Sequence, residues 1–386
     1  RAWGVPLSIF YNKATGQPLV DSKLNERIVK MYEENGCDIW FEKSIEELLG
    51  NEYNADDYEK VDDILDVWFD SGCTHAFVLD GKEDQIWPAS IYLEGTDQHR
   101  GWFHSSLLES CGTRGVAPYE SVLTHGFVLH EDGNKMSKSS SNIVPPAEIV
   151  EKAGADILRL WVASSDYSED LKIGPEIIKS NADSYRRLRN TLRFILGNLN
   201  DFSEDEKVKF LDLPELDQYI LHKLAHLEDE VLKSYQSFEY QRVFSAIFNF
   251  CTNELSSFYF DVRKDSLYCD HRNSLARKAT RTVLDILFNH LLKLLAPILC
   301  FTTEEAWQSR LGTNSSIHNQ DFPSSNQSWI NKDLSSKWDY LKSIRKNVNG
   351  AIEIERKNKL IGSSLEADVE INLVNADEML KIDVRG

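Results

Sequence analysis

The sequence has no hydrophobic run long enough to cross a membrane. A membrane-spanning helix needs roughly 18 or more consecutive apolar residues, and no stretch of the 386 residues reaches that length. The chain also shows no signal-peptide pattern and no internal repeat. Its 41% hydrophobic and 11% aromatic residues are typical of folded globular domains, so the composition argues against a membrane partner and against disorder.

Paired cysteines are missing as well. The six cysteines are scattered, with no Cys-x-x-Cys spacing, which is typical of reduced cytosolic thiols and gives no zinc site. We therefore expect a cytoplasmic protein. His222 and His226 are four residues apart, a spacing that can bind a metal. Because no Glu stands between them and no third ligand is evident, we interpret both as surface residues and expect no metal site.

Positive charge is scarce overall. The formal net charge is -19, which disfavours non-specific binding of nucleic acid, because phosphates are bound by Lys and Arg side chains. Basic residues are nevertheless clustered at 186–193 and at 272–281. An acidic body with basic faces favours a polyanion of defined shape over polyanions in general. The charge pattern therefore leaves a nucleic-acid partner open.

A short loop at 135–139, Lys-Met-Ser-Lys-Ser, combines two ammonium groups with hydroxyls. The apolar residues at 121–129 predict a strand before it, and Asp132-Gly133-Asn134 predicts a turn. Such a loop can hold phosphates, although a solvated basic turn explains the same residues. After the loop, Pro146 predicts the start of a helix that ends at Gly154.

Polar residues also follow an apolar strand predicted at 91–93. They open a helix predicted at 103–110 and comprise Glu94, Gly95, Asp97 and Gln98. In α/β sheets, ligands bind at the carboxyl ends of parallel strands, and these side chains suit an ammonium group or ribose hydroxyls. Trp102 would supply an apolar wall. The alternative is that Asp97 caps the helix and Trp102 is part of the core.

Two further patterns frame these clusters. Residues 64–72 predict an apolar strand that carries Asp66 and Asp70 on either side of Trp68-Phe69, a further site candidate. Alternation of strand, helix and strand predicts a parallel sheet whose mouth holds both the acidic residues and the lysines. We expect Asp156 to cap the helix that follows Gly154.

Beyond about residue 175 the pattern becomes helical. Apolar residues recur at three- and four-residue steps, which predicts a bundle, in the segments 216–231, 244–258 and 283–295. His290 lies in the last of these stripes and is interpreted as a core residue. A Ser/Asn-rich linker follows Gly312, and then a helix is predicted at 338–356 and a final strand at 365–373.

Taken together and in this order, these blocks resemble the class I aminoacyl-tRNA synthetases, and in particular the isoleucyl-tRNA synthetase family. The lysine loop matches the family's KMSKS loop. The other matching blocks are DVWFDSG at 66–72, YLEGTDQHRGWF at 92–103, His125-Gly126, GADILR at 154–159 and YRRLRNT at 185–191. The resemblance covers most of the chain and is weakest across the linker and after Leu373.

The resemblance implies an α/β fold: the second half of a Rossmann-like, nucleotide-binding parallel sheet, followed by an all-α anticodon-binding helical bundle. It implies four parts, namely a connecting segment after an editing insertion (1–60), the second half of the catalytic domain with the KMSKS loop and stem-contact helices (61–175), the bundle (176–312), and a linker with a C-terminal α/β segment (313–386). The family's His-x-Gly-His motif is absent from the sequence. We therefore expect this chain alone to be a poor catalyst or inactive.

The implied activity is that of an isoleucine-tRNA ligase, which forms isoleucyl-adenylate from isoleucine and ATP and transfers the isoleucyl group to tRNA(Ile). The resemblance assigns Lys135 and Lys138 to the triphosphate as catalytic residues. It assigns to the adenylate and its surroundings Glu94, Gly95, Asp97, Gln98, Trp102, His125, Gly126, Met136, Ser137 and Lys138. The expected ligands are ATP, with Mg²⁺ as its counterion, isoleucine and tRNA(Ile), bound by a monomer. A valyl enzyme, or a tRNA-binding piece without catalysis, is the alternative.

Overall fold

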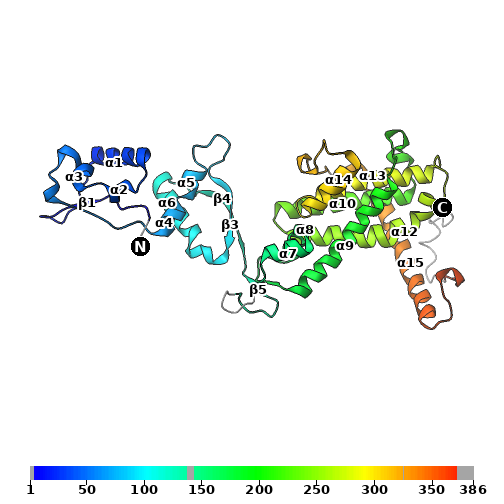
Figure 1. The fold of residues 1–386 in the computed structure, drawn as a ribbon. Coiled ribbons are helices and arrows are strands. Elements are labelled where there is room, and N and C mark those ends of the chain that lie inside the picture. The colour runs from blue at the N-terminus through cyan, green and yellow to red at the C-terminus, as the bar shows by residue number, and fades with distance from the viewer. Residues whose placement is uncertain (1–3, 137–142, 325, 372–386) are drawn as a thin grey trace. The chain divides into compact units, whose positions relative to one another are not determined.

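The computed structural model describes residues 4–136, 143–324 and 326–371. The chain divides into two compact units, Arg1–Phe127 and Val128–Gly386 (Figure 1). Each unit is described by itself below. The finer division into four parts stays a prediction.

The first unit begins with a small subdomain. Strand β1 (Phe10–Asn12) pairs antiparallel with β2 (Tyr58–Lys60), and three helices lie between them in the chain, α1 (Ser22–Asn35), α2 (Ile39–Glu42) and α3 (Ile45–Leu49). Their core is a cluster of buried residues: Phe10, Leu24, Ile28, Trp40, Leu48 and Leu49.

Local capping explains where α3 begins and ends. The Ser44 hydroxyl accepts the N–H of Glu47, and the Glu47 carboxylate accepts the N–H of Ser44, a capping box that satisfies two N–H groups of the first turn. Gly50 follows the last residue with φ 70°, a backbone angle that favours glycine. Ser44 and Gly50 thus set the two ends of α3.

The rest of the first unit is a two-stranded parallel sheet with helices. Strands β3 (Ala89–Gly95) and β4 (Tyr119–His125) are joined by the 3₁₀ turn η3 (Thr96–Arg100) and helix α6 (Trp102–Arg114). Two short helices precede them, α4 (Val67–Gly72) and α5 (Thr74–Val78), and α4 packs against α6. The parallel pairing, the strand at 91–93 and the helix at 103–110 are confirmed.

The strand predicted over 64–72 is wrong, because most of this segment is helix α4. The Asp66 carboxylate accepts the N–H of Trp68 at 2.8 Å and caps the first turn. Short apolar runs do not distinguish a strand from a helix by periodicity, and here the capping Asp66 and the close packing of Gly72 on α6 favour the helix.

The second unit begins with a short parallel pair, β5 (Val128–His130) and β6 (Leu171–Ile173). The strand predicted over 121–129 is thus interrupted at Gly126-Phe127. The turn after β5 is confirmed: the Gly133 N–H donates to the His130 carbonyl at 2.8 Å, and the His130 N–H donates to the Asn134 carbonyl at 3.0 Å. Helix α7 (Pro146–Ala153) begins and ends as expected, and α8 (Ala155–Ser164) follows.

A helical bundle makes up most of the second unit. Its helices are α9 (Pro175–Asn198), α10 (Glu215–Gln236), α11 (Tyr240–Asn249), the π-helical segment η7 (Phe250–Tyr259), α12 (Phe260–Tyr268), α13 (Leu275–Leu295), α14 (Cys300–Leu311) and α15 (Lys332–Lys357). Short 3₁₀ turns of this unit lie at Glu204–Glu206, Phe210–Asp212, Ile317–Asn319, Gln327–Trp329 and Ser364–Glu366, and the first unit has two more at Gly50–Glu52 and Ala55–Asp57. The predicted bundle and the helix at 338–356 are confirmed.

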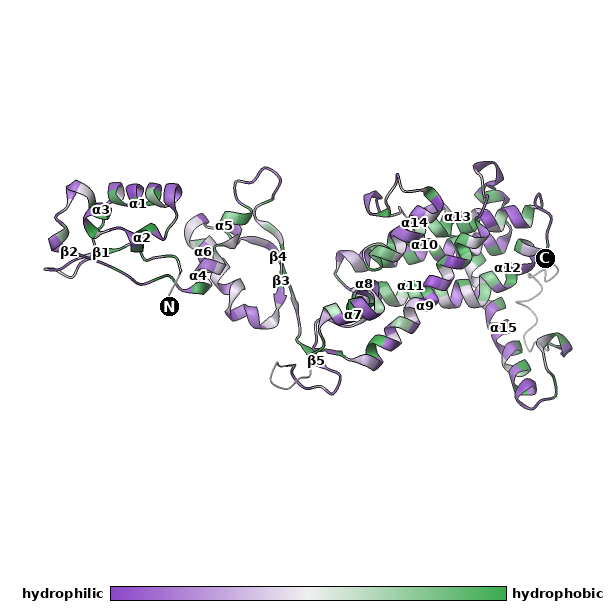
Figure 2. Cartoon of the chain, in the orientation of Figure 1, coloured by the Kyte–Doolittle hydropathy of each residue, from purple (hydrophilic) through white to green (hydrophobic). Residues whose placement is uncertain are grey.

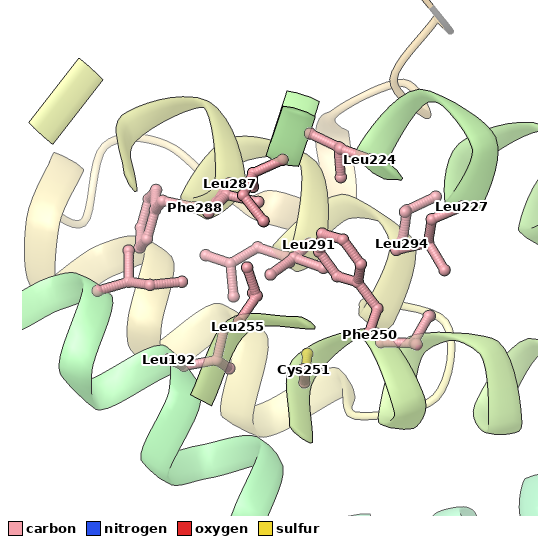
Figure 3. Close-up of a cluster of buried hydrophobic side chains, with 14 of the residues drawn as sticks. Leu192, Leu224, Leu227, Phe250, Cys251, Leu255, Leu287, Phe288, Leu291 and Leu294 are labelled. Atoms are coloured by element: carbon pink, nitrogen blue, oxygen red, sulfur yellow. The ribbon is translucent and has the colours of Figure 1, made fainter. Parts of the chain in front are cut away.

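The bundle core forms where the apolar stripes of these helices meet. Figure 2 shows hydrophobic and hydrophilic residues alternating along α10 and α13, as expected of helices with one buried face. Figure 3 shows side chains from α9, α10, η7 and α13 packed together, among them Leu192, Leu224, Leu255, Leu287, Phe288 and Leu291. No helix within the described residues is long and apolar enough to span a membrane.

Three expectations for the second unit are wrong. The strand predicted at 365–373 is absent from its described part, where Leu365 lies in a 3₁₀ turn and is 96% exposed. His222 is buried and accepts the N–H of Asn331 at 3.0 Å, and burial lowers the pKa of its imidazole. Asp156 does not cap α8, because its carboxylate is bound to the first turn of α14.

Candidate active site

The predicted binding residues of the first unit meet at one edge of its parallel sheet. The register pairs Glu94 with Thr124 and Gly95 with His125, so the carboxyl ends of β3 and β4 lie side by side. The chain continues from β3 into the polar turn 96–100 and from β4 into the buried Gly126. The structure therefore brings together six residues that the sequence placed on two separate segments: Glu94, Gly95, Asp97, Gln98, His125 and Gly126.

Gly95 allows the close approach at the centre of this edge. A Cβ atom built on Gly95 would lie 2.6 Å from Asp97 Oδ1 and 3.8 Å from His125 Cε1. A side chain at this position would therefore displace the Asp97 carboxylate. Because φ of Gly95 is −63°, any residue could adopt its backbone conformation, so the glycine matters here because it leaves room for the Asp97 carboxylate in its present position.

Gln98 organises the start of helix α6. Its Oε1 accepts the N–H of Trp102 at 2.9 Å, and its Nε2 donates to Asp97 Oδ2 at 3.2 Å. Gln98, not Asp97, thus satisfies an N–H group of the first helical turn. The exposed Asp97 carboxylate is oriented by Gln98 and stays available to a ligand.

Trp102 is a half-buried wall with a fixed orientation. Its ring stacks on Tyr92 with the centroids 4.2 Å apart and the planes at 3°, and its Nε1 donates to the Ser71 carbonyl at 2.9 Å. Sequence patterns did not place Trp68 near this wall. A Cβ atom on Gly101 would lie 3.2 Å from Trp68 Cη2, and Trp68 is 46% exposed, so a second indole lies beside the same edge.

His125 presents one free ring nitrogen. Its Nδ1 donates to the Gly126 carbonyl at 2.8 Å, so Nε2 of the neutral imidazole is left as a hydrogen-bond acceptor. With the exposed carboxylates of Glu94 and Asp97, the edge offers acceptors for an ammonium group and for hydroxyls. The two indoles supply apolar surface next to them.

The lysine loop belongs to the second unit. Lys135 is exposed and pairs in an antiparallel bridge with Leu129 of β5, so the loop starts directly from this strand. Met136 packs against a small apolar cluster of Ile149, Trp161 and Ile173. Ser137 and Lys138 lie outside the described residues. That the lysines and the Glu94 edge form one site stays a prediction.

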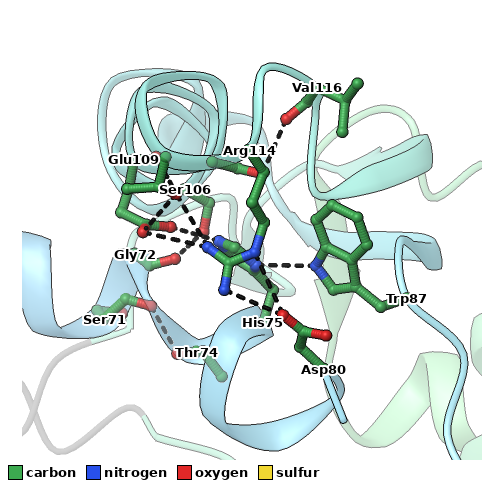
Figure 4. A network of polar contacts seen from close by, with 12 residues as sticks. Ser71, Gly72, Thr74, His75, Asp80, Trp87, Ser106, Glu109, Arg114 and Val116 are labelled. Carbon is green, nitrogen blue, oxygen red and sulfur yellow. Dashed lines mark hydrogen bonds and ion pairs between the residues drawn. The ribbon is translucent and has the colours of Figure 1, made fainter.

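A polar network fastens the helices that support the edge (Figure 4). His75 is buried; it donates from Nε2 to Glu109 at 2.6 Å and accepts from Trp87 Nε1 at 3.0 Å. Arg114 pairs with Asp80 at 3.1 Å and lies over the ring of Trp87. The network joins α5 to the far end of α6, and its partners are too distant in sequence for a local motif to reveal them.

Gly72 of α4 packs closely against α6, and we expect Gly72→Ala to destabilise this unit. A Cβ atom there would lie 3.0 Å from the Ser105 carbonyl carbon and 3.1 Å from the Ser106 nitrogen, backbone atoms that cannot move aside. Overpacking of this kind costs about 1–3 kcal/mol. Thermal unfolding should show the loss. Gly112→Ala on the partner helix α6 is the matched control, because nothing lies within 4 Å of its Cβ position; an equal loss there would contradict the packing argument.

Two family models match the chain. One describes class I tRNA synthetases (I, L, M and V) and matches residues 1–174, and the other describes the anticodon-binding domain of tRNA ligases and matches residues 217–371. Together with the parallel sheet, its polar edge and the helical bundle, they show that the chain belongs to the class I tRNA synthetases.

Within this class the chain is similar to isoleucine–tRNA ligases. It is 54% identical over 376 residues to the enzyme of Pelagibacter ubique, in an alignment that covers 97% of this chain and 42% of the relative. The enzyme of Zymomonas mobilis is 49% identical over 376 residues, with 96% and 40% covered. The chain thus spans about two fifths of the length of these curated relatives.

Solved structures agree on the fold. A LeuRS of Agrobacterium radiobacter, in a ternary complex with tRNA and LeuAMS, superposes with a TM-score of 0.65 at 17% identity, covering 85% of this chain and 42% of that chain. A Mycobacterium tuberculosis methionyl-tRNA synthetase in complex with methionyl-adenylate gives a TM-score of 0.53 at 16% identity, covering 78% and 70%. In the parts of this chain that the structure describes, no group of three or more His, Cys, Asp or Glu could hold a metal ion.

Proposed function

We propose that this chain is the region of a longer isoleucine–tRNA ligase that carries one edge of the adenylate site and part of the tRNA-binding surface. The observation that carries the proposal is the edge at which Gly95 and Asp97 meet His125. The full reaction joins the isoleucine carboxylate to the α-phosphate of ATP with release of pyrophosphate, and then passes the isoleucyl group to a ribose hydroxyl of tRNA(Ile) with release of AMP. The relatives are isoleucine–tRNA ligases that align with nearly the whole chain, which supports this reading.

The residues of the edge suit the isoleucyl-adenylate part of this reaction. Glu94 and Asp97 are exposed carboxylates that would bind the ammonium group of isoleucine and hydroxyls of the ribose. Trp102, held by Tyr92 and Ser71, would line the side-chain pocket. His125 would border the adenine through Nε2, and Gly126 would border it through its backbone. None of these groups needs to donate or remove a proton, so their contribution is orientation.

The phosphates are assigned to the lysine loop. Negative charge gathers on the phosphate oxygens in the transition state, and ammonium groups directed at those oxygens lower the barrier. Lys138 and Lys135 would supply this charge, while Met136 anchors the start of the loop in its apolar cluster and Ser137 adds a hydroxyl. Mg²⁺ would enter with ATP as the counterion of its phosphates.

Helix α9 offers the surface for tRNA. Arg186 pairs with Asp183, and Arg189 pairs with Glu305. Arg187 and Arg193 are exposed, and among the described residues no ion pair engages them. Free guanidinium groups along one helix are suited to the phosphates of RNA. We propose that tRNA(Ile) contacts the bundle here and that the enzyme acts as a monomer.

Amino-acid-dependent exchange of pyrophosphate into ATP tests the proposal. The longer enzyme should exchange with isoleucine at least about tenfold more efficiently than with valine, because the smaller side chain leaves part of a hydrophobic pocket unfilled. Leucine and methionine should be poorer still. Equal or better exchange with any of the three would refute the assignment to isoleucine. Exchange by this chain alone would refute the expectation that the His-x-Gly-His half is needed.

A further inference from the structure

Asp156 is a buried carboxylate that binds the start of another helix. It lies in the first turn of α8, is 6% exposed, and accepts the N–H of Thr302 at 2.7 Å and the N–H of Phe301 at 3.3 Å. The Thr302 hydroxyl donates to it at 2.6 Å. These donors belong to the first turn of α14, where N–H groups have no intrahelical partner and where negative charge is favourable.

Arg159, one turn further along α8, binds the segment that precedes α14. Its Nε donates to the Ile298 carbonyl at 3.0 Å, and its Nη2 donates to the Pro297 carbonyl at 2.6 Å. These carbonyls follow the end of α13. A single turn of α8 therefore places the Asp156 carboxylate on N–H groups at the start of α14. It also places the Arg159 guanidinium on carbonyls of the segment between α13 and α14. The two contacts are oriented hydrogen bonds, so they fix the position of α8 along the bundle.

The same contact continues to the arginine-bearing helix α9. The Tyr185 hydroxyl and the Thr302 hydroxyl are 2.9 Å apart, and Arg189 donates to the Tyr185 oxygen at 3.2 Å. Arg189 also pairs with Glu305 of α14 at 2.9 Å. Because the Thr302 hydroxyl donates its one hydrogen to Asp156, it accepts from the Tyr185 hydroxyl and so links α8, α9 and α14.

The opposite side of α8 bears on the base of the lysine loop. Trp161 is buried with Ile149 of α7 and Ile173 of β6, in the cluster against which Met136 packs. The Trp161 Nε1 donates to the Lys172 carbonyl at 3.0 Å. Strand β6 pairs with β5, the strand that leads into the loop. Through Trp161, α8 therefore contacts both β6 and the cluster that holds Met136.

We propose that Asp156 and Arg159 are positioning residues for the transfer of the isoleucyl group to tRNA. They hold α8, and with it the base of the lysine loop, in fixed register with the bundle that holds the tRNA. Apolar packing also joins α8 to the bundle, where Leu160 is fully buried, but such packing is non-directional and permits sliding that the hydrogen bonds prevent. The inference rests on the proposed function. It adds the residues that would fix the position of the bound tRNA relative to the lysine loop.

Kinetics of the longer enzyme test the inference. Asp156→Asn removes the charge and one of the two acceptor oxygens, and Arg159→Gln removes the paired donors. Each should lower kcat of tRNA charging, up to about 100-fold, because misplacement by about 1 Å costs that much. Isoleucine-dependent pyrophosphate exchange without tRNA should stay within about twofold, since the adenylate residues are untouched. Arg159→Lys should restore part of the charging rate, as it keeps the charge and one donor.

Glu151→Gln is the matched control, because Glu151 is an exposed carboxylate on the neighbouring helix α7. It should change neither reaction. Equal losses of charging and exchange, or unchanged charging, in Asp156→Asn and Arg159→Gln would overturn the inference. If the unsubstituted enzyme shows no isoleucine-dependent exchange, the proposed function fails instead, and the two failures are distinguishable.

Hydrogen exchange provides a second readout on this chain itself. Adding tRNA should slow amide exchange in α9 and also in α7 and α8, because the hydrogen bonds connect these helices. In the Asp156→Asn/Arg159→Gln double variant the slowing should remain in α9 and be lost from α7 and α8. Slowing that persists in α7 and α8 of the double variant would overturn the inference, even if the variant folds with a lower Tm.

Discussion

Replacing Lys138 with Ala lowers isoleucine-dependent pyrophosphate exchange by about 100- to 1,000-fold, the range found when one preorganised electrostatic donor is removed from a transition state. The reason is that charge develops on phosphate oxygens while the α-phosphate is attacked. A positioned ammonium group stabilises that charge without reorganisation of solvent. The effect should fall on kcat, and the KM for isoleucine should change little, because isoleucine is assigned to the edge of the first unit.

The control for this prediction is Lys152→Ala. Lys152 is an exposed lysine on α7 that pairs with Glu148 of the same helix. Lys152→Ala therefore removes one positive charge, as Lys138→Ala does, but from a position outside the loop. Its exchange rate should equal that of the unsubstituted enzyme. Lys135→Ala should give an intermediate loss. Comparable losses in the Lys138 and Lys152 variants would show that overall charge, not a positioned group, supports the reaction, and an unchanged rate for Lys138→Ala would refute its assignment.

The edge of the first unit was predictable because its determinants are local. A strand at 91–93, a glycine and a polar turn before a helix fix the direction of β3, and a parallel partner aligns the next carboxyl end. The sequence pattern could therefore name Glu94 and Asp97, whereas His125 was assigned only by the family resemblance. It could not tell which residue caps α6, because Asp97 and Gln98 both lie near the start of that helix and only the geometry assigns the bond to Gln98.

Contacts between distant segments were not predictable. Asp156 stands at the start of a helix, and its local pattern indicates a cap, yet its acceptors are occupied by α14, 145 and 146 residues further along the chain. His222 has a metal-like or surface-like spacing, and only the fold shows that Asn331 binds it. His290 was interpreted as a core residue, but its side chain is 20% exposed; it hydrogen-bonds to the buried Glu228, and its ring lies beside Trp329. In each case a partner more than 60 residues away decides the role.

A buried ionic cluster in the bundle leads to the second large effect: Asp217→Ala should lower the free energy of unfolding by about 3–5 kcal/mol, because removing one partner leaves the other charge buried and unpaired. Asp217 is fully buried in α10 and accepts the Tyr259 hydroxyl at 2.5 Å. It also pairs with Arg263, whose side chain is 14% exposed. Burial and the neighbouring carboxylate of Asp217 raise the pKa of Tyr259, so the phenol remains a donor that would lose its acceptor.

Urea unfolding followed by far-UV circular dichroism measures this loss, since the bundle contributes most of the helical signal. Asp183→Ala, which removes an exposed partner of Arg186 on α9, is the control and should leave the midpoint nearly unchanged. The double variant Asp217→Leu/Arg263→Met should be more stable than Asp217→Ala, because it removes both charges and fills their volume. If the double variant is instead less stable than the single one, the unpaired guanidinium is not the cause of the loss, and the lost packing around the Asp217 side chain would have to account for it.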